Sequence, residues 1–592
     1  MIYYSACLKD CYDTCSIITK VENGNILING NKNNPITDGF LCLKSKWYVE
    51  ASHTKYRITK PYLNKNGKFY DISWREAFNI IAERIKDYDR FLPYDYAGNR
   101  GLISYNFPQR LFNYYGTLKL KHSLCDEAGN NMLKNLLGTS TGYDPEKLDD
   151  VDVYIYWGMN PAWTNIHGYV KVKKSNAKII VIDPTITETA KSANLHIRIF
   201  PGHDFKFALF VAKLLNDKLK KYPDIDISFK ELDDNEINYG IKLSNILLNS
   251  KNPVIHMGYG FQRQLNGALS VMAIAYILSI LDKEYNFIYD RKHKIDYEYL
   301  RGKNENRKEI NQYTISEETD KFDTIFIYGS NPFNSLSNQK KFRERIKEKG
   351  IYVITHELYY NDTVMNSDLI LPAAHFFEFN DLVDSYFHDY IMLNQKIFNP
   401  PEQALSNHDL FVNLAKFLGI NDKFLLEDEM SIIENIIKRS NLDKEYLFKN
   451  GFCKIEPDIF RGKFNYQYFI ENLNNYIDEK NNGFRLLSPT HLNLIGSLHN
   501  NIYEIDNFIY INDQDAKELN IKDNDDVRVY NDKYSVITKA KISDKILKGT
   551  VLIYRGHWIK NYGWNVNFLT DDKAQLFEGP SQQSSYVYIE KL

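Results

Sequence analysis

The chain has 592 residues, too many for one hydrophobic core, and at roughly 150 residues per domain it predicts about four domains. Hydrophobic residues make up 43% and charged residues 25%, which is typical of a globular enzyme. The formal net charge of −2 argues against nucleic acid or an anionic membrane as the main partner, and six cysteines in so long a chain do not make a disulfide framework.

Neither a targeting segment nor a membrane span is expected. The first residues, MIYYSACLKD, contain no basic or apolar leader, and no run of about 18 apolar residues follows. Thiols kept for a metal also imply a reducing compartment. We therefore expect a cytoplasmic protein with no nucleic acid partner and no membrane insertion.

Four cysteines stand near the N-terminus. Cys7, Cys11 and Cys15 follow C-x3-C-x3-C spacing, and Cys42 comes after a gap of 26 residues. Four thiolates suit a 4Fe-4S cluster, but a structural zinc ion also takes four cysteines. Zinc ligands usually come as two close pairs, so the three-plus-one spacing favours the cluster over zinc, with free thiols as the third alternative.

The N-terminal part predicts a small strand-rich module followed by helices. Alternating residues around Asn23-Gly24 indicate a hairpin. After Ile72, apolar residues at helical spacing follow Ser73, and Glu76 three residues later completes a capping box. We expect a strand over 101–106 (GLISYN) and a helix that opens near Cys125.

Repeated strand–loop–helix units occupy residues 149–335 and predict a parallel sheet covered on both faces. Such sheets bind ligands at the carboxyl ends of their strands. A second α/β block begins near residue 351, and residues 421–482 are mostly helical in pattern. From about His491 short strands with tight turns predict a β-barrel.

Two loops share the pattern Gly-x-Asn-Pro after an apolar strand, one at 158–161 and one at 329–332. Glycine allows close approach of the backbone to a ligand, and asparagine supplies hydrogen bonds. Neither loop is a known phosphate fingerprint. A single such loop is more often a turn, but two in the same register favour binding. Asp183, after another strand, stands where an acid commonly accepts from ribose hydroxyls; an exposed turn acid is the alternative.

Other residues give weaker signals. Cys125 taken alone is more often a small buried residue than a ligand. The histidines, among them His122, His167 and His256, form no H-x-x-x-H pair, and no G-x-S-x-G motif is present. A mononuclear zinc hydrolase and a serine hydrolase therefore have no support.

Taken together, the motifs resemble the molybdopterin oxidoreductases, the dimethyl-sulfoxide-reductase-like family. The similarity runs in the family's order from one end of the chain to the other. Its segments are CLKDCYDTC…GFLCLKSK, YDISWREAFNIIAERI, WGMNPAWTN, VIDPTITETA, FPGHDFKFAL, YGSNPF, DTVMNSDLILPAAHFFEFNDLV, IYINDQDAKELNIKDNDDVRVYND, GTVLIYRGHW and VNFLTDD.

The resemblance implies an α/β multidomain enzyme with a bis-(molybdopterin guanine dinucleotide) cofactor holding molybdenum or tungsten, and one 4Fe-4S cluster. The expected regions are an iron–sulfur module at 1–57, a discontinuous α/β domain at 58–140 plus 340–480, a dinucleotide-binding-like α/β domain at 141–339, and a double-psi β-barrel at 481–592.

The resemblance also assigns residues to the two dinucleotides. One dinucleotide would be held by Trp157, Gly158, Asn160, Thr164, Asp183, Thr187, Gly202 and Asp204. The other would be held by Gly258, Gly260, Gly329, Asn331, His356, Asp362, Thr363 and Asp368. Weaker candidates in the C-terminal domain are Asn493, Asn565 and Asn567.

For the chemistry, the family's metal-ligand loop matches HSLCDEAG, so Cys125 would bind the metal, and a soft thiolate suits molybdenum or tungsten. Lys44 falls at the family's lysine between cluster and pterin. Asp126 and His167, with His122 and Glu127, are expected near the substrate. Asp126 stands where the formate dehydrogenases have a histidine.

The expected function is a two-electron oxidoreductase acting on a small molecule by oxygen-atom or hydride transfer. Electrons would pass through the pterin and the cluster to a separate electron-transfer protein or subunit. Two alternatives remain: a non-redox hydratase or transhydroxylase of the same fold, and an electron-transfer subunit without the metal cofactor.

Overall fold

The first three cysteines lie in the loop between the first two strands of a small antiparallel sheet. In the computed structural model, which describes residues 1–479, 481–503 and 505–592, this sheet has the order β1-β2-β3. Its strands are β1 (Ile2–Ala6), β2 (Ser16–Glu22) and β3 (Asn25–Gly30). Asn23 and Gly24 have φ of 50° and 79°, as a two-residue hairpin turn requires. The predicted hairpin is confirmed.

A five-stranded parallel sheet has the order β10-β9-β8-β11-β12. Its strands are β8 (Val153–Trp157), β9 (Lys178–Ile182), β10 (Leu195–Ile197), β11 (Pro253–Met257) and β12 (Phe287–Ile288). Ile155 and Trp157 pack into one apolar core, while Tyr154 and Tyr156 pack into another. Both faces are therefore covered, as the near-continuous apolar strands predict.

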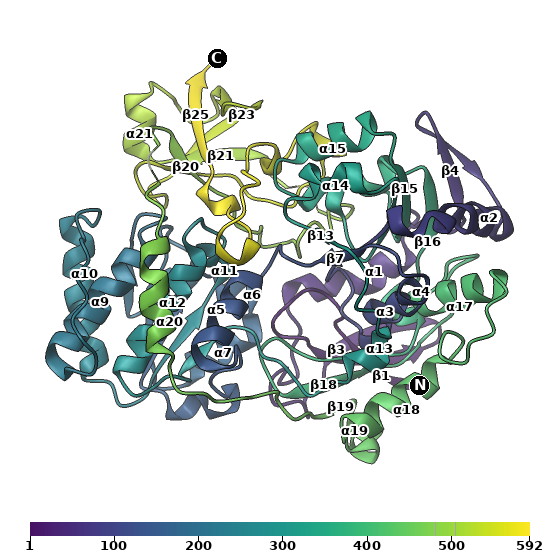
Figure 1. Ribbon diagram of the computed structural model, residues 1–592, viewed down its shortest axis with the longest axis horizontal. Coiled ribbons are helices and arrows are strands. Elements are labelled where there is room, and N and C mark those ends of the chain that lie inside the picture. The colour runs from purple at the N-terminus through teal and green to yellow at the C-terminus, as the bar shows by residue number, and fades with distance from the viewer. Residues whose placement is uncertain (480, 504) are drawn as a thin grey trace.

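Helices on both sides supply these cores. The elements around this sheet are α5 (Glu127–Leu137), α6 (Pro161–Thr164), α7 (Ile166–Lys174), α8 (Glu188–Lys191), α9 (Asp204–Leu219), α10 (Asp234–Leu248), α11 (Tyr259–Gln262), α12 (Gly267–Ile280) and α20 (Tyr466–Asn472). The wholly buried α12 packs against α9, α5 and α20, so residues far apart in the sequence share one lobe (Figure 1).

A second, six-stranded sheet has the order β5-β4-β16-β15-β14-β6. Its strands are β4 (Tyr62–Lys65), β5 (Lys68–Asp71), β6 (Phe91–Asp95), β14 (Thr324–Tyr328), β15 (Tyr352–Glu357) and β16 (Leu369–Pro372). Strand β14 pairs in parallel with β6 and β15, although the sequence division had placed it with residues 141–339.

The second lobe is completed by helices and short strands. They are α1 (Tyr48–His53), α2 (Trp74–Arg84), α3 (Leu102–Asn106), α4 (Pro108–Tyr115), β7 (Lys119–Lys121), α13 (Tyr297–Arg301), β13 (Glu309–Asn311), α14 (Pro332–Ser335), α15 (Gln339–Glu348), α16 (Asp362–Met365), β17 (Asp381–Val383), β18 (Tyr390–Asn394), α17 (Asn407–Phe417), α18 (Glu429–Arg439), α19 (Lys444–Asn450) and β19 (Phe452–Lys454).

Two local predictions in this lobe have opposite outcomes. The capping box is confirmed, because Ser73 and Glu76 cap α2 reciprocally. The strand predicted over 101–106 is wrong: Leu102–Asn106 is helix α3. In its first turn, the N–H groups of Ile103 and Ser104 donate to the carboxylate of Asp381 at 2.8 and 3.0 Å. A cap from so far along the chain is invisible in local sequence.

The C-terminal residues form a closed barrel of order β20-β24-β21-β23-β22-β25. Its elements are β20 (Phe484–Leu487), β21 (Phe508–Ile511), α21 (Asp513–Glu518), β22 (Asp526–Tyr530), β23 (Ser535–Ile542), β24 (Thr550–Leu552), α22 (Ile559–Tyr562) and β25 (Tyr586–Lys591). Exposed and buried residues alternate along β23, as a barrel wall requires. The expected multidomain α/β fold with a C-terminal barrel is confirmed.

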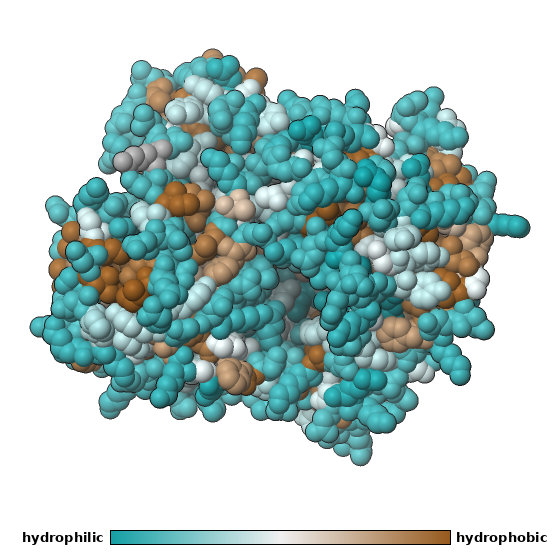
Figure 2. All heavy atoms as spheres, in the orientation of Figure 1, coloured by the Kyte–Doolittle hydropathy of each residue, from teal (hydrophilic) through white to brown (hydrophobic). Residues whose placement is uncertain are grey.

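In Figure 1 the barrel lies above the first lobe and beside α14 and α15 of the second, and Figure 2 shows this face of the molecule hollowed between the lobes. Among the described residues, no helix is both long and apolar enough to cross a membrane.

Candidate active site

A cavity of about 860 Å³ lies between the carboxyl ends of the five-stranded sheet and the barrel. Its walls come from the loops after β8, β9 and β11 and from barrel residues around β20, β23 and β24, which is where parallel α/β sheets bind ligands. The predicted residues that line it are Cys11, Lys44, Cys125, Gly158, Asn160, Thr164, Asp183, Thr187, Asp204, Gly258 and Gly260.

The loop after β8 is held in a close approach to the loop after β11. Gly158 has φ +65°, and a Cβ at Gly258 or Gly260 would overlap its carbonyl oxygen. The Asn160 side-chain oxygen accepts from the N–H of Thr189 at 3.3 Å and from its hydroxyl at 2.6 Å. Both loops are therefore fixed, with their backbones bordering the cavity.

Two acids border the same part of the cavity. Asp183, after β9, accepts from the N–H and hydroxyl of Thr185, and burial raises its pKa to about 6. Asp204, at the start of α9, accepts from the Trp157 indole at 2.8 Å, and burial also raises its pKa. Trp157 does not line the cavity but positions Asp204 from behind. Gly202, with φ +106°, does not line it either.

At Cys125 the cavity meets a guanidinium group. Arg263 donates to the Cys125 sulfur from Nη2 at 3.0 Å and to its carbonyl oxygen from Nε at 3.4 Å. Burial raises the pKa of Cys125 to about 12, although Arg263 acts against the shift. Asp10 and Arg555 line the same cavity. Sequence reasoning missed Arg263, Asp10 and Arg555, although Asp10 stands beside a cysteine of the quartet.

The four N-terminal cysteines line one smaller cavity together with Lys44 and Tyr48. The Cys7 sulfur lies 3.0 Å from the Tyr48 hydroxyl. Burial raises the pKa of Cys15, and Asp13 and the other three thiols add to the rise, so the thiols lie close together. Four sulfur donors around one space match the chemistry of an iron–sulfur cluster. Among the described residues, no three His, Cys, Asp or Glu side chains are grouped around a single-ion site.

The two cavities adjoin. Both are lined by Cys11, Lys44, Trp163, Thr164 and Ile495. Lys44 is buried and donates from Nζ to the Trp163 carbonyl oxygen at 2.9 Å. Lys44 therefore stands in the wall that the two cavities share. Its role between the cluster and the pterin stays a prediction.

Two residues predicted near the substrate, His167 and Asp126, do not line the large cavity. His167 stacks on Phe40 at 4.0 Å between ring centroids, and its Nδ1 lies 3.6 Å from the Cys15 sulfur. Its N–H donates to Asp13, so α7 begins against the cysteine module and not at Cys125.

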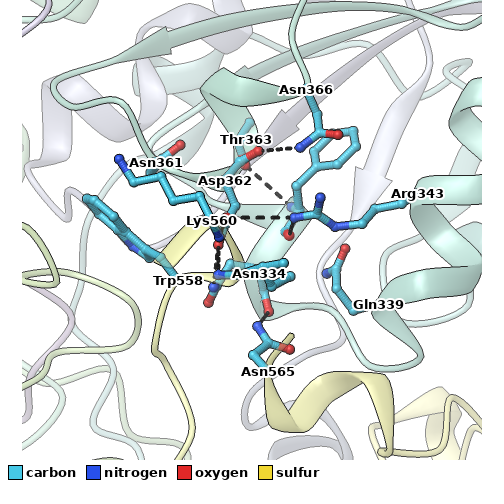
Figure 3. A network of polar contacts seen from close by, with 12 residues as sticks. Asn334, Gln339, Arg343, Asn361, Asp362, Thr363, Asn366, Trp558, Lys560 and Asn565 are labelled. Carbon is cyan, nitrogen blue, oxygen red and sulfur yellow. Dashed lines mark hydrogen bonds and ion pairs between the residues drawn. The ribbon is translucent and has the colours of Figure 1, made fainter. Parts of the chain in front are cut away.

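The residues assigned to the second dinucleotide, apart from Gly258 and Gly260, do not line this cavity. Two of them, Asp362 and Thr363, belong to a polar network that includes Trp558, Lys560 and Asn565 of the C-terminal segment (Figure 3). Asn331 accepts from the N–H and hydroxyl of Thr363 at 3.1 and 2.7 Å. Buried Asp362 accepts from the Asn334 amide at 2.7 Å and from the N–H groups of Ile559 and Lys560 at 2.8 and 2.9 Å.

The remaining assigned residues also have partners within the protein. Asn565 and Asn567 donate to the Asn334 carbonyl oxygen at 3.0 and 2.8 Å. His356 bonds to the Asn407 side chain at 2.8 Å, and Asp368 accepts from the Val353 N–H at 2.8 Å. The other two members of the set, Gly329 and Asn493, do not line the cavity.

Comparison with known proteins is consistent with this layout. Residues 57–417 match the family model "Molybdopterin oxidoreductase", and residues 490–584 match "Molydopterin dinucleotide binding domain". The chain is 27% identical to "Probable oxidoreductase YoaE" of Bacillus subtilis, over 100% of this chain and 98% of that protein. It is 24% identical to "F420-dependent formate dehydrogenase subunit alpha" of Methanocaldococcus jannaschii, over 98% of each.

Among solved structures, "Acetylene Hydratase from Pelobacter acetylenicus" superposes with a TM-score of 0.83 at 16% identity, over 100% of both chains. That likeness concerns the fold. A parallel sheet with a large cavity at the carboxyl ends of its strands is an arrangement in which α/β proteins bind dinucleotide cofactors. The chain belongs to the molybdopterin oxidoreductase family, and its cofactor is a molybdopterin dinucleotide with molybdenum or tungsten.

Proposed function

We propose that the protein is a molybdenum- or tungsten-dependent oxidoreductase that carries out two-electron chemistry on a small substrate. Electrons would pass by way of a 4Fe-4S cluster to a separate redox partner, in the cytoplasm. The observation that carries the proposal is the pair of adjoining cavities, one bordered by Cys125 and the other by the cysteine quartet.

The lining residues fit the proposed groups. Cys125 would bind the metal, which when bound supplies a centre that changes by two electrons. Cys7, Cys11, Cys15 and Cys42 would bind the cluster. The Asp183 carboxylate would accept hydrogen bonds from one dinucleotide, and the Thr187 hydroxyl would donate to it. We retain the second dinucleotide, and the four-region division of the chain, as part of the proposal.

The chain's own residues have distinct tasks in this scheme. Arg263 donates a hydrogen bond to the Cys125 sulfur, which favours the thiolate form that ligates metal. Lys44 holds a buried positive charge in the wall shared by the two cavities, where it offsets the negative charge of an electron in transit. Tyr12, Tyr259 and Tyr386 border the cavity and limit water near Cys125.

The decisive test is metal, iron and pterin analysis of the purified protein, coupled to a dye-linked substrate screen. We expect molybdenum or tungsten, pterin, and four irons per chain, with dye reduction or oxidation on a small substrate. Iron without molybdenum or tungsten would favour the electron-transfer subunit. Substrate turnover that neither reduces nor oxidises a dye would favour the non-redox alternative, whose fold is that of the superposed hydratase.

The variant Cys125→Ala should keep iron and pterin but lose turnover by about 10³-fold or more, because it removes the thiolate proposed as the metal ligand. Cys453→Ala is the matched control, since Cys453 is a buried cysteine of β19 that lines neither cavity. Unchanged turnover in Cys125→Ala would refute the ligand assignment.

The variant Cys11→Ala should lose iron and lower the thermal stability, because cluster ligation and folding are linked. Iron and acid-labile sulfide are measured beside the Cys453→Ala protein. Four irons per chain in Cys11→Ala would show that the quartet is wrongly assigned.

A further inference from the structure

Arg263 reaches Cys125 from a short turn and not from a helix or a strand. The turn, residues 263–266, joins α11 to α12, and the guanidinium donates to the Cys125 sulfur from Nη2 at 3.0 Å. Within the turn, the Arg263 N–H donates to the Tyr259 carbonyl oxygen at 3.2 Å. A side chain on a loop keeps a reactive geometry only where neighbouring residues hold that loop. The position of the guanidinium therefore depends on what packs against residues 263–266.

Both ends of the turn are held by Gln575, a buried residue of the C-terminal segment that lines neither of the two adjoining cavities. Its Nε2 donates to the Gln262 carbonyl oxygen at 2.6 Å, and its side-chain oxygen accepts from the Ala268 N–H at 2.9 Å. Gln262 comes directly before the turn, and Ala268 comes two residues after its end. A second bond from Nε2, to the Pro580 carbonyl oxygen at 2.6 Å, ties the amide to its own segment.

Two further bonds from the same segment reach the middle of the turn. The Gln583 N–H donates to the Arg263 carbonyl oxygen at 2.9 Å, and the Ser584 hydroxyl accepts from the Leu265 N–H at 2.8 Å. Residues 575–584 therefore bond to the turn at its ends and in its middle.

The same segment also packs on the helix that follows Cys125. Phe577 and Glu578 have φ of +62° and +58°, a left-handed conformation that costs free energy in residues other than glycine. At Gly579 the backbone lies so close to α5, which begins two residues after Cys125, that an added Cβ would stand 2.5 Å from the Ala128 Cβ. Such strain persists only where surrounding contacts fix it. One segment therefore contacts both the turn that carries the guanidinium and the helix that follows the thiol.

We propose that Gln575 is a positioning residue for the reaction, which acts by holding the Arg263 guanidinium against the Cys125 sulfur. This inference rests on the proposed function, in which Cys125 binds the metal. Gln575 lines neither cavity, so its effect reaches the site only through Arg263. A hydrogen bond to a ligand sulfur withdraws electron density from it and raises the reduction potential of the metal. Without the Gln575 amide the guanidinium moves away from the sulfur, and the potential falls.

The test uses the purified holoenzyme, with its metal, iron and pterin content measured first. The midpoint potential of the metal is obtained by redox titration followed by electron paramagnetic resonance. Arg263→Gln, which removes the charged donor, should lower this potential, and Gln575→Met, which keeps the volume but removes the amide, should lower it too. Gln575→Met should also reduce dye-linked turnover about 10- to 100-fold, the loss expected when a reacting geometry shifts by about 1 Å.

A double-mutant cycle separates positioning from a general loosening of the fold. Because Gln575 acts through Arg263, the double variant of Arg263→Gln and Gln575→Met should have the potential of Arg263→Gln alone. The matched control is Asn216→Leu in α9, where a buried amide donates to the Tyr222 carbonyl oxygen at 2.8 Å and accepts from its N–H at 2.9 Å. Asn216 lines neither cavity, so this variant should lower the thermal stability and leave the potential unchanged.

Ser584→Ala is the milder variant, because it removes only the acceptor of the Leu265 N–H from the turn. It should lower the potential less, and it decides the question if Gln575→Met does not fold. A wild-type potential in Gln575→Met, or in Ser584→Ala in its place, would overturn the inference. So would an equal shift in Asn216→Leu, or shifts of Arg263→Gln and Gln575→Met that add in full. Absence of molybdenum, tungsten and pterin from the wild-type protein would instead refute the proposed function.

Discussion

The two Gly-x-Asn-Pro loops have the same internal geometry but different surroundings. Gly158 and Gly329 have φ of +65° and +58°, and a proline begins a short helix after each loop. In each loop the asparagine oxygen accepts from the N–H and hydroxyl of one threonine, Thr189 or Thr363. The same residue types at the same spacing therefore fold in the same way twice.

The correspondence extends beyond the loops. Asp183 and Glu357 stand at the ends of β9 and β15, each six residues before its threonine. Eleven residues after Asp183 and Glu357, the side chains of Asn194 and Asp368 accept from Ile179 and Val353, at 2.8 Å in both cases.

From this register we propose one change to the residues assigned to the second dinucleotide. Asp368 corresponds to Asn194, whose side chain forms a hydrogen bond to a strand of the sheet. Glu357 corresponds to Asp183, the acid that lines the cavity. Glu357, which the sequence reasoning missed, is therefore the better candidate acid for a second dinucleotide. The sequence does contain a signal for Glu357, because the acid precedes its threonine by six residues in both repeats.

The difference lies in what covers each loop. The first loop borders the large cavity. In the second loop, Asn331 donates to the Ser497 hydroxyl at 2.9 Å, and nearby Asp362 accepts from the N–H groups of Ile559 and Lys560. A local motif thus sets a loop's shape, while a distant segment decides whether a ligand can reach it. A second dinucleotide at Asn331 requires these contacts to separate.

The largest expected effect comes from Asp362→Ala. Removing this buried carboxylate leaves the Asn334 amide and the N–H groups of Ile559 and Lys560 without their acceptor. The free energy of unfolding should fall by about 3–5 kcal/mol. Denaturant unfolding of the cofactor-free protein measures it. The matched control is Glu188→Ala, five residues after Asp183 as Asp362 is after Glu357, where an exposed acid pairs with Lys191. It should cost about 0.5 kcal/mol or less, and equal losses would break the comparison.

A smaller effect separates the two asparagines. Asn331→Ala removes the bonds to Thr363 and to Ser497 in a packed region, and should cost about 2–3 kcal/mol. Asn160→Ala removes the bonds to Thr189, but water from the cavity can replace them, so we expect about 1 kcal/mol. Thermal unfolding of the cofactor-free proteins gives the ranking, and a reversed order would show that the second loop is the more accessible one.

Much of the fold could be read from the sequence because its signals are local. The hairpin at Asn23-Gly24 and the capping box at Ser73 depend on neighbours within a few residues. The start of helix α3 depends on no near neighbour, because the carboxylate that caps it belongs to Asp381, 278 residues from Ile103. The meeting of Arg263 with Cys125 spans 138 residues, and no local pattern marks it. The sequence also does not predict that residues after 496 cover the second loop, because those contacts too join distant parts of the chain.

A further expected effect, smaller than that of Asp362→Ala or Asn331→Ala, concerns the first acid. Burial raises the pKa of Asp183 to about 6 in the folded protein, against about 3.9 in the unfolded chain. The folded state therefore holds a proton that the unfolded state has lost between these values, and stability falls as the pH rises from about 4 to about 6. Two pKa units correspond to about 2.7 kcal/mol, and partial exposure to the cavity reduces this to about 1–2 kcal/mol.

Asp183→Asn removes this dependence while keeping an oxygen for Thr185. In the cofactor-free protein it should match the wild type near pH 4 and be about 1–2 kcal/mol more stable at pH 7. Glu357→Gln should act in the same direction, because burial also raises the pKa of Glu357 while Lys9 acts against the shift. Denaturant unfolding at pH 4 and pH 7 measures both. If only Asp183→Asn gains stability at pH 7, the two acids are not equivalent and the correspondence between the repeats stops at the threonines.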